Sequence, residues 1–308
     1  AEKVNPEEIR NIIADLLSNT GFNEAMNNSL TKGKYTDLIS ELDTSQNIEI
    51  LNPLSQDLNV MRQSLLFSGL ENIAYNQNRK NTDIKFYEFG KTYHKTEEGN
   101  VENQHLQILV SGRVSAENWN TSSDKANFHY IKEKVEHILN RLRIKNYKVS
   151  EGSGWGRAYS LTYSFRKKRL VCFGKVTKDL CNKFGIKSDV YMADFNWDLV
   201  LELVGYNKIK HKEVSKFPEV RRDLSLLIDG SVSFAELLKI AKQTDNNILK
   251  SVNLFDIYEG DKLPEGKKSY ALSFIMNDAN NTLTDKHVEK VMKRLINSFT
   301  EKVGAKLR

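Results

Sequence analysis

Apolar positions in the first two thirds of the chain switch between helical and strand spacing. A 3.6-residue period predicts an opening helix that starts at Pro6, has Asn5 as its N-cap and stops at Gly21. Two further helices are expected near 63–76 and 126–142. Alternating positions predict strands, which lie near 26–31, 48–51, 84–90 and 105–112, and in a hairpin over 159–165 and 171–173. The pattern indicates a mixed α+β region of mostly antiparallel strands with helices on one face.

The last hundred residues have a clearer order of elements. The stretch 205–216 is polar and lacks periodicity, so we expect a linker over 208–215 between a unit of residues 1–207 and one of 216–308. The predicted elements are strand 222–228, helix 234–243, strand 248–258, strand 269–276, helix 285–299 and strand 305–307. This β-α-β-β-α-β order is typical of the ferredoxin-like split βαβ fold.

Composition narrows the class of protein. The 308 residues carry 46 Lys and Arg against 40 Asp and Glu, a net charge of +6 that is compatible with an RNA partner without indicating one. The two cysteines, Cys172 and Cys181, form no metal-binding pair and no disulfide framework, which favours a reducing compartment. Since no apolar run reaches ~18 residues and the N-terminus has no signal-peptide core, we expect no membrane association.

The sequence offers no set of residues typical of catalysis or metal binding. Gly152, Gly154 and Gly156 form a G-x-G-x-G run, but an alternating segment follows where a phosphate-binding loop needs a helix, so a loop entering a hairpin is expected. The six histidines lack ligand spacing, and no nucleophile elbow is present. We therefore expect no catalytic residue, no metal site and no cofactor in this chain.

Five motifs of the last unit resemble the ferredoxin-fold anticodon-binding domain. They appear in that family's order and run from Lys216 to the chain end: KFPEVRRD at 216–223, FDIYEG at 255–260, PEGKKS at 264–269, NTLTD at 281–285 and the final Leu307-Arg308. That domain closes the β subunit of bacterial phenylalanyl-tRNA synthetase. The resemblance implies that residues 216–308 bind the anticodon stem-loop of phenylalanine tRNA.

The upstream unit resembles the preceding part of the same β subunit family. The matching segments are NPLS at 52–55, MRQSLL at 61–66 and FYEFG at 86–90. Departures occur at Gly154-Trp155, where the family has His-Pro, and at Thr177-Lys178-Asp179, where it has Leu-His-Pro. The resemblance implies a class II synthetase-like module without the active site, placed after the family's tRNA-binding, helical and editing domains.

The resemblance also implies a set of partners. The module would pack against the catalytic α subunit in an (αβ)2 enzyme of the cytoplasm, which joins phenylalanine to its tRNA with ATP and Mg²⁺. This chain alone would be inactive. The expected subunit-interface residues are Asn52, Pro53, Arg62 and Ser64, with a helix-start salt bridge as the equally weighted alternative for Arg62.

Alternation assigns the faces of the last unit's sheet. Leu224, Leu226 and Ile228 should pack on the helices, as should Tyr270, Leu272, Phe274 and Met276. The remaining small and polar positions would form an open face for flat bases. The candidate RNA-binding residues are Arg221, Ser225, Tyr258, Lys267, Lys268, Ser269, Ala271 and Ser273. For Arg222 and Asp223 we favour pairing that fixes the first strand.

Two other functions remain open from the sequence. Ferredoxin-like domains also bind small molecules, so the last unit is alternatively an amino-acid-binding regulatory module. A standalone enzyme that uses the loop Gly152–Gly156 is the third candidate.

Overall fold

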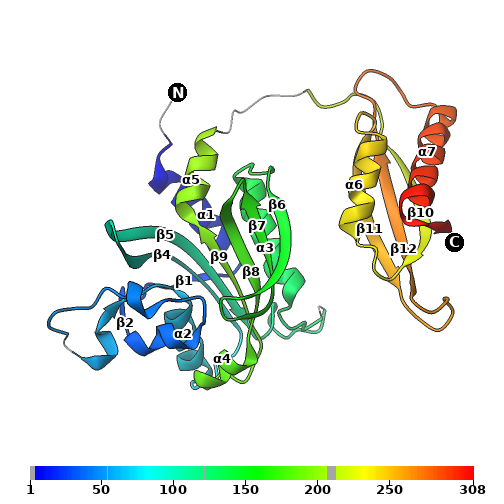
Figure 1. The fold of residues 1–308 in the computed structure, drawn as a ribbon. Coiled ribbons are helices and arrows are strands. Elements are labelled where there is room, and N and C mark those ends of the chain that lie inside the picture. The colour runs from blue at the N-terminus through cyan, green and yellow to red at the C-terminus, as the bar shows by residue number, and fades with distance from the viewer. Residues whose placement is uncertain (1–3, 54, 121, 207–212) are drawn as a thin grey trace. The chain divides into compact units, whose positions relative to one another are not determined.

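The chain divides into two compact units, Ala1–Ile209 (unit 1) and Lys210–Arg308 (unit 2), each with its own hydrophobic core. The computed structural model describes residues 4–53, 55–120, 122–206 and 213–308. Figure 1 shows the large sheet of unit 1 in cyan to green and unit 2 in yellow to red.

Unit 1 is built around a seven-stranded sheet of order β1-β4-β5-β9-β8-β7-β6. Its strands are β1 (Asn23–Glu24), β4 (Ile84–Thr96), β5 (Gly99–Ser111), β6 (Lys148–Gly154), β7 (Arg157–Phe165), β8 (Lys168–Val176) and β9 (Val190–Asn196). All neighbours pair antiparallel except β1 and β4, which are parallel.

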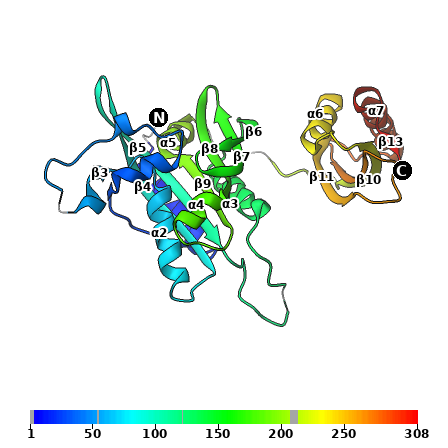
Figure 2. The same ribbon diagram turned by 60° about the horizontal axis from the view of Figure 1, so that its bottom comes forward.

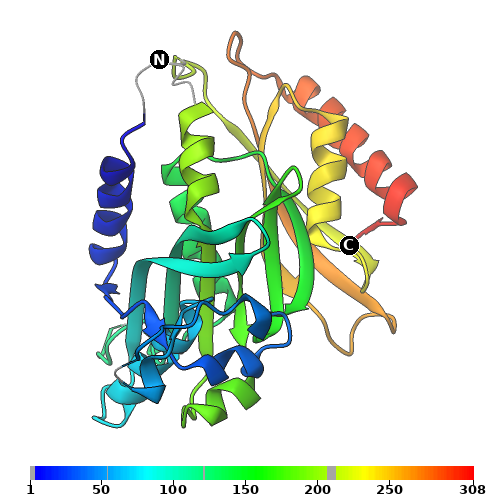
Figure 3. The same cartoon turned by 60° about the vertical axis from the view of Figure 1, so that its left-hand side comes forward.

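Helices pack on both faces of this sheet. Leu106, Ile108 and Val110 of β5 join the core that contains α1 (Pro6–Ser18), α3 (Phe128–Arg141) and α5 (Trp197–Tyr206). Leu109, of opposite orientation on the same strand, joins a second core with α2 (Leu66–Gln77), α4 (Lys178–Lys183) and the 3₁₀ segment η1 (Gly33–Leu38). Because successive side chains of β5 point to opposite faces, this strand contributes residues to both cores. Figure 3 shows α2 and α4 at the lower end of the sheet.

Several expected elements of unit 1 are confirmed, and their ends have physical causes. Asn5 caps α1 by accepting a hydrogen bond from the Glu7 amide at 3.2 Å, and Pro6 occupies the first helical position. The hairpin with the basic turn is formed by β7 and β8. The strand expected at 84–90 continues to Thr96, because its ladder with β5 runs the whole length of both strands.

Other elements of unit 1 were not predicted or are shorter than predicted. The strands β6 and β9 and the helices α4 and α5 had no counterpart in the sequence-based assignment. The strands expected over 26–31 and 48–51 shrink to β2 (Leu30–Thr31), which pairs with β3 (Val60–Met61), and to a single bridge between Glu49 and Val60. The 3₁₀ turns η2 (Thr44–Gln46) and η3 (Gln56–Leu58) occupy the connecting segment.

Unit 2 has the β-α-β-β-α-β order that the sequence predicts. Its elements are β10 (Val220–Asp229), α6 (Phe234–Thr244), β11 (Leu249–Tyr258), β12 (Lys267–Met276), α7 (Asp285–Val303) and β13 (Lys306–Leu307). The strand order is β11-β12-β10-β13, and β12 is antiparallel to both of its neighbours. Two register shifts interrupt β11, between Leu249 and Ser251 and between Leu254 and Asp256.

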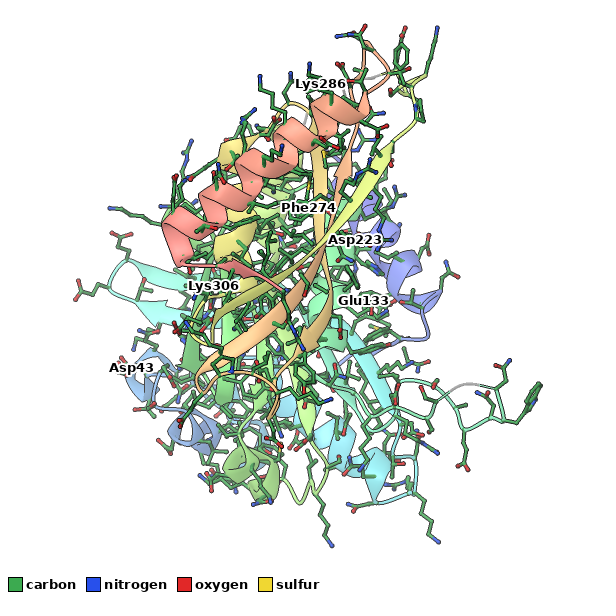
Figure 4. All side chains as sticks on the ribbon, turned by 90° about the vertical axis from the view of Figure 1, so that its right-hand side faces the viewer. Asp43, Glu133, Asp223, Phe274, Lys286 and Lys306 are labelled. Carbon is green, nitrogen blue, oxygen red and sulfur yellow. The ribbon has the colours of Figure 1, made fainter. Side chains whose placement is uncertain are left out.

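Both helices of unit 2 lie on one face of its sheet, and the other face carries no helix (Figure 2). Phe274 projects from β12 toward α7, where its ring lies 6.2 Å from that of Phe299 (Figure 4). Thr284 caps α7 by accepting from the His287 amide. Among the described residues, no helix is long and apolar enough to cross a membrane.

Candidate nucleic-acid interface

The helix-free face of the unit 2 sheet carries the side chains that the sequence places outward on β10. Arg221 and Asp223 are exposed and Ser225 is half-buried, whereas Leu226 and Ile228 are buried against the helices. The alternation expected for this strand is therefore confirmed, and Asp223 is labelled on it in Figure 4.

Arg221 is held in a fixed position on this face. Its guanidinium Nε donates to Asp223 at 2.8 Å, and these hydrogen bonds raise the pKa of Arg221. The same guanidinium lies 5.6 Å from the ring centroid of Phe255 on β11, within cation–π range. Arg222, on the opposite side of β10, instead pairs with Asp285 at 3.0 Å. Both arginines thus make the strand-fixing ion pairs we favoured for Arg222 and Asp223.

A second arginine and a second ring meet on the same face. The guanidinium of Arg308 lies 5.0 Å from the ring centroid of Tyr258, and the Arg308 amide donates to the Ser225 carbonyl at 3.1 Å. Arg308 follows the edge strand β13, while Tyr258 lies on β11 at the other edge. The two side chains therefore reach toward each other across the two central strands.

This arrangement changes the interpretation of two candidate residues. Ser269 and Ser273 were expected to be outward and open, but they are 4% and 5% exposed. Ser269 is the register partner of Tyr258, and its hydroxyl lies 3.3 Å from that of Ser225. Both serines are therefore buried, and the side chains exposed on this face are the arginines and rings of the neighbouring strands. Ala271, between them, is half-buried.

The two lysine candidates differ from each other. Lys268 is 8% exposed and lies two positions before Tyr270 on β12, so its side chain faces the helices as that of Tyr270 does. Its Nζ lies 4.7 Å from the centroid of the Tyr270 ring. Its place in the proposed RNA-binding set is therefore wrong. Lys267 is exposed, and its position along β12 places its side chain on the open face. Its Nζ lies 3.5 Å from Oδ2 of Asp229.

The sequence analysis missed Phe255 and Arg308. Phe255 falls at the register shift between Leu254 and Asp256, so alternation along β11 does not give its face. Its side chain is 50% exposed, which is unusual for a large apolar residue inside a strand. Arg308 follows a two-residue strand that is too short to have a readable period.

One expected interface residue of unit 1 is buried in the fold. Arg62 is 3% exposed, and its Nη1 donates to Glu88 of β4 at 2.7 Å while its Nε donates to the Lys91 carbonyl at 2.9 Å. Arg62 therefore makes a salt bridge, as the alternative expected, but it is a buried one to strand β4 rather than an exposed one, and little of its surface is left for a partner. Ser64 is half-buried and accepts from the Leu66 amide at 3.2 Å, whereas Asn52 and Pro53 are exposed.

The glycine run at 152–156 lies in the hairpin between β6 and β7. Gly154 and Gly156 adopt φ of +104° and +73°, a region that favours glycine. A strand follows the run, so the helix that a phosphate loop requires is not there.

The side chains able to bind a metal are dispersed over the described residues. No group of three or more His, Cys, Asp and Glu side chains gathers within the described ranges.

Two family models match successive parts of the chain. Residues 2–197 match the phenylalanyl-tRNA synthetase beta chain CLM domain, and residues 215–308 match the ferredoxin-fold anticodon-binding domain. The chain belongs to the phenylalanyl-tRNA synthetase beta chain family. The two matches account for the class II-like sheet followed by the ferredoxin-like unit, which the sequence predicts.

Curated relatives agree with these models. The phenylalanine–tRNA ligase beta subunits of Bacteroides fragilis and Bacteroides thetaiotaomicron are 42% identical over 313 residues, and that of Clostridium acetobutylicum is 32% identical over 308 residues. Each alignment covers 98% of this chain and 38% of the relative. The chain thus spans about two fifths of the length of these relatives.

Solved structures show the same fold for unit 1. A pyrrolysyl-tRNA synthetase from Desulfitobacterium hafniense superposes with a TM-score of 0.52 at 14% identity, covering 64% of this chain and 68% of that one. A second structure of that enzyme superposes with a TM-score of 0.51 at 16% identity, covering 64% of this chain and 66% of that one. The synthetase-type sheet is thus shared at low sequence identity.

Proposed function

We propose that the open face of unit 2 binds the anticodon stem-loop of phenylalanine tRNA. The observation that carries the proposal is the presence of two arginine–aromatic pairs, Arg221 with Phe255 and Arg308 with Tyr258, on a sheet face without helices. Rings and guanidinium planes are the groups on which unstacked bases stack. The match to an anticodon-binding domain supports the same assignment.

The charge of unit 2 favours loop recognition over general polyanion binding. From His211 to Arg308 the sequence holds 17 Lys and Arg against 14 Asp and Glu. Nonspecific binding to a phosphate backbone needs a larger excess of cations. A nearly balanced unit with exposed rings is better suited to reading a few bases, and this favours RNA over the regulatory-module alternative.

We propose that unit 1 supports the catalytic α subunit within an ATP- and Mg²⁺-dependent phenylalanine–tRNA ligase of the cytoplasm. The names of the relatives support this assignment. In such an enzyme the chain would contribute by orienting the tRNA, an effect on the entropy of the reaction rather than on its chemistry. Asn52 and Pro53 remain the candidate contacts with the α subunit, next to Leu51, which is 97% exposed.

The RNA proposal is tested by comparing Arg221→Ala with Arg222→Ala in the full chain, with the α subunit present. The two arginines are neighbours on β10 but point to opposite faces, so Arg222→Ala is a matched control. Loss of one stacking contact costs about 1–3 kcal/mol, so the dissociation constant for phenylalanine tRNA should rise roughly 5- to 150-fold for Arg221→Ala. Fluorescence anisotropy at low salt measures it.

The same titration with an altered anticodon provides the decisive comparison. Wild-type chain should prefer the native anticodon, and Arg221→Ala should reduce that preference. Equal affinity for both tRNAs, or equal losses for the two variants, would contradict recognition by this face.

A further inference from the structure

Two short basic runs of unit 1 meet at one groove. The segments 141–148 (RLRIKNYK) and 166–169 (RKKR) hold eight Lys and Arg and no Asp or Glu. The first run begins at the last residue of α3 and reaches β6, and the second forms the turn of the β7–β8 hairpin. Because β6 pairs with β7, with Lys148 opposite Ser164, the fold brings the two runs together.

The groove has a volume of about 510 Å³ and lies between these runs and the end of α5. Its charged lining residues are Arg143, Lys145, Arg166 and Glu202. The carboxylate of Glu202 is already paired with Lys168, at 3.4 Å. Within the described ranges the side chains of the three lining cations form no ion pair, so the groove carries a local excess of positive charge.

Two of these cations occupy backbone positions that favour glycine. Arg143 follows the C-cap of α3 with φ of +58°, and Arg166 is the first of the two turn residues of the β7–β8 hairpin with φ of +54°. Glycine is the usual residue at both kinds of position, because any other side chain is strained there. The chain thus gives up stability at both positions, and what it keeps in return is a positive charge at the groove.

Two aromatic rings line the same groove. Tyr206, at the end of α5, is 71% exposed, and the guanidinium of Arg166 lies 5.4 Å from the ring centroid of Phe165. Guanidinium groups match the geometry of phosphates, and exposed rings stack on bases. An acidic peptide would use the cations but not the rings, so the combination favours a nucleic-acid strand.

We infer that this groove binds a single-stranded segment of RNA, with its phosphates on Arg143, Lys145 and Arg166 and a base on Tyr206. All of these residues belong to unit 1, and none takes part in the anticodon proposal for unit 2. The inference rests on the proposed function only for the choice of RNA over DNA.

The test measures how the affinity of the full chain for a labelled oligouridine depends on salt, by fluorescence anisotropy. For a single strand, each phosphate contact adds about 0.7 to the slope of log affinity against log salt concentration. The double variant Arg143→Gly/Arg166→Gly should therefore lower that slope by about 1.4 and weaken binding roughly 25-fold at about 0.1 M salt. An unchanged slope would overturn the inference.

The glycine variants also separate binding from folding. Because glycine relieves the backbone strain at both positions, the double variant should unfold at the wild-type temperature or above it. Arg143→Asn/Arg166→Asn, which also tolerates this backbone conformation, should lose the same part of the salt slope. A loss of affinity that appears in the glycine variant but not in the asparagine variant would contradict a role of the two charges.

Lys80→Gly is the matched control. Lys80 is exposed, has φ of +66° and follows α2 on the opposite face of the sheet, so its substitution removes a charge from the same backbone conformation away from the groove. It should leave the salt slope unchanged, and an equal loss would indicate a general effect of net charge. Polyglutamate that competes as well as unlabelled oligouridine would also contradict the inference, since it offers charge without bases.

A background of Arg221→Ala keeps this test apart from the one for unit 2. The groove variants should lower the salt slope by the same amount in that background, because the residues concerned lie in different units. A groove effect that disappears in Arg221→Ala would assign the binding to unit 2 alone and overturn the inference for unit 1. Failure of the anticodon preference, in contrast, would leave the groove measurement intact.

Discussion

At the scale of single residues, the ion pair between Arg62 and Glu88 shows how burial changes the role of a charge. Their side chains are 4% and 5% exposed, and Glu88 also accepts from the side-chain amide of Asn27 at 2.7 Å. Each charge is therefore satisfied by its neighbours within the chain. Removing one member leaves the other buried and uncompensated.

Glu88→Gln should destabilise unit 1 by about 3–5 kcal/mol, because it leaves the Arg62 guanidinium without its anion. The control is the same substitution at Glu102, which pairs with Lys91. The side chain of Glu102 is 54% exposed and that of Lys91 is 51% exposed. Glu102→Gln should change stability by about 0–1 kcal/mol. Denaturant unfolding followed by circular dichroism measures both, and similar losses for the two variants would contradict this account.

Local residue roles were predictable where the partner is near in sequence. The caps at Asn5 and Thr284 involve amides two and three residues away, so the sequence alone predicts them. Arg62 and Glu88 are 26 residues apart, on segments that meet only in the folded sheet. Contacts of this kind have no signal in a local pattern.

At the scale of elements, the strands of unit 2 were predicted, whereas the central strand β9 of unit 1 was not. β10 alternates clearly because only one face of its sheet meets helices. β9 lies between β5 and β8 in the middle of the large sheet, and its first four residues are all buried. An uninterrupted apolar run of this length has no period of two, so alternation cannot reveal it.

The pairing of β7 with β8 depends on a close backbone approach at Gly174. A Cβ at this position would lie beside the Tyr159 carbonyl oxygen and 2.8 Å from the Ser160 Cα, and neither backbone atom can yield cheaply. Gly174→Ala should therefore destabilise unit 1 by about 1–3 kcal/mol.

Gly152 on the edge strand β6 is the matched control for Gly174. A Cβ there meets nothing within 4 Å, so Gly152→Ala should be nearly neutral. Thermal unfolding of the two variants provides the measurement. A loss of stability at Gly152 as large as that at Gly174 would contradict the steric explanation.

At the scale of the whole molecule, the two units have separate cores. Phe195 is fully buried among the helices α1, α3 and α5 and their sheet face, and Phe274 is fully buried between α7 and the sheet of unit 2. The sequence predicts this organisation, because the split βαβ order appears as one uninterrupted block. The open face was also predictable from alternation, but the arginine–aromatic contacts across it were not, since they join strands that are not neighbours in the sheet.

Phe274→Leu should loosen unit 2 by about 1 kcal/mol and leave unit 1 unchanged, because core substitutions act on the core that contains them. Phe195→Leu should loosen unit 1 and leave unit 2 unchanged. Hydrogen exchange followed by mass spectrometry resolves the two units. Faster exchange in both units from either variant would indicate one cooperative structure.

The interrupted register of β11 also bears on how the protein avoids self-association. A long regular edge strand offers unpaired amides and carbonyls to any other chain, which is a route to fibres and aggregates. In unit 2 one edge is β11, broken by two register shifts, and the other is the two-residue β13. The interrupted β11 edge therefore offers no long straight template, so opening one face of this sheet does not leave that edge ready for polymerisation.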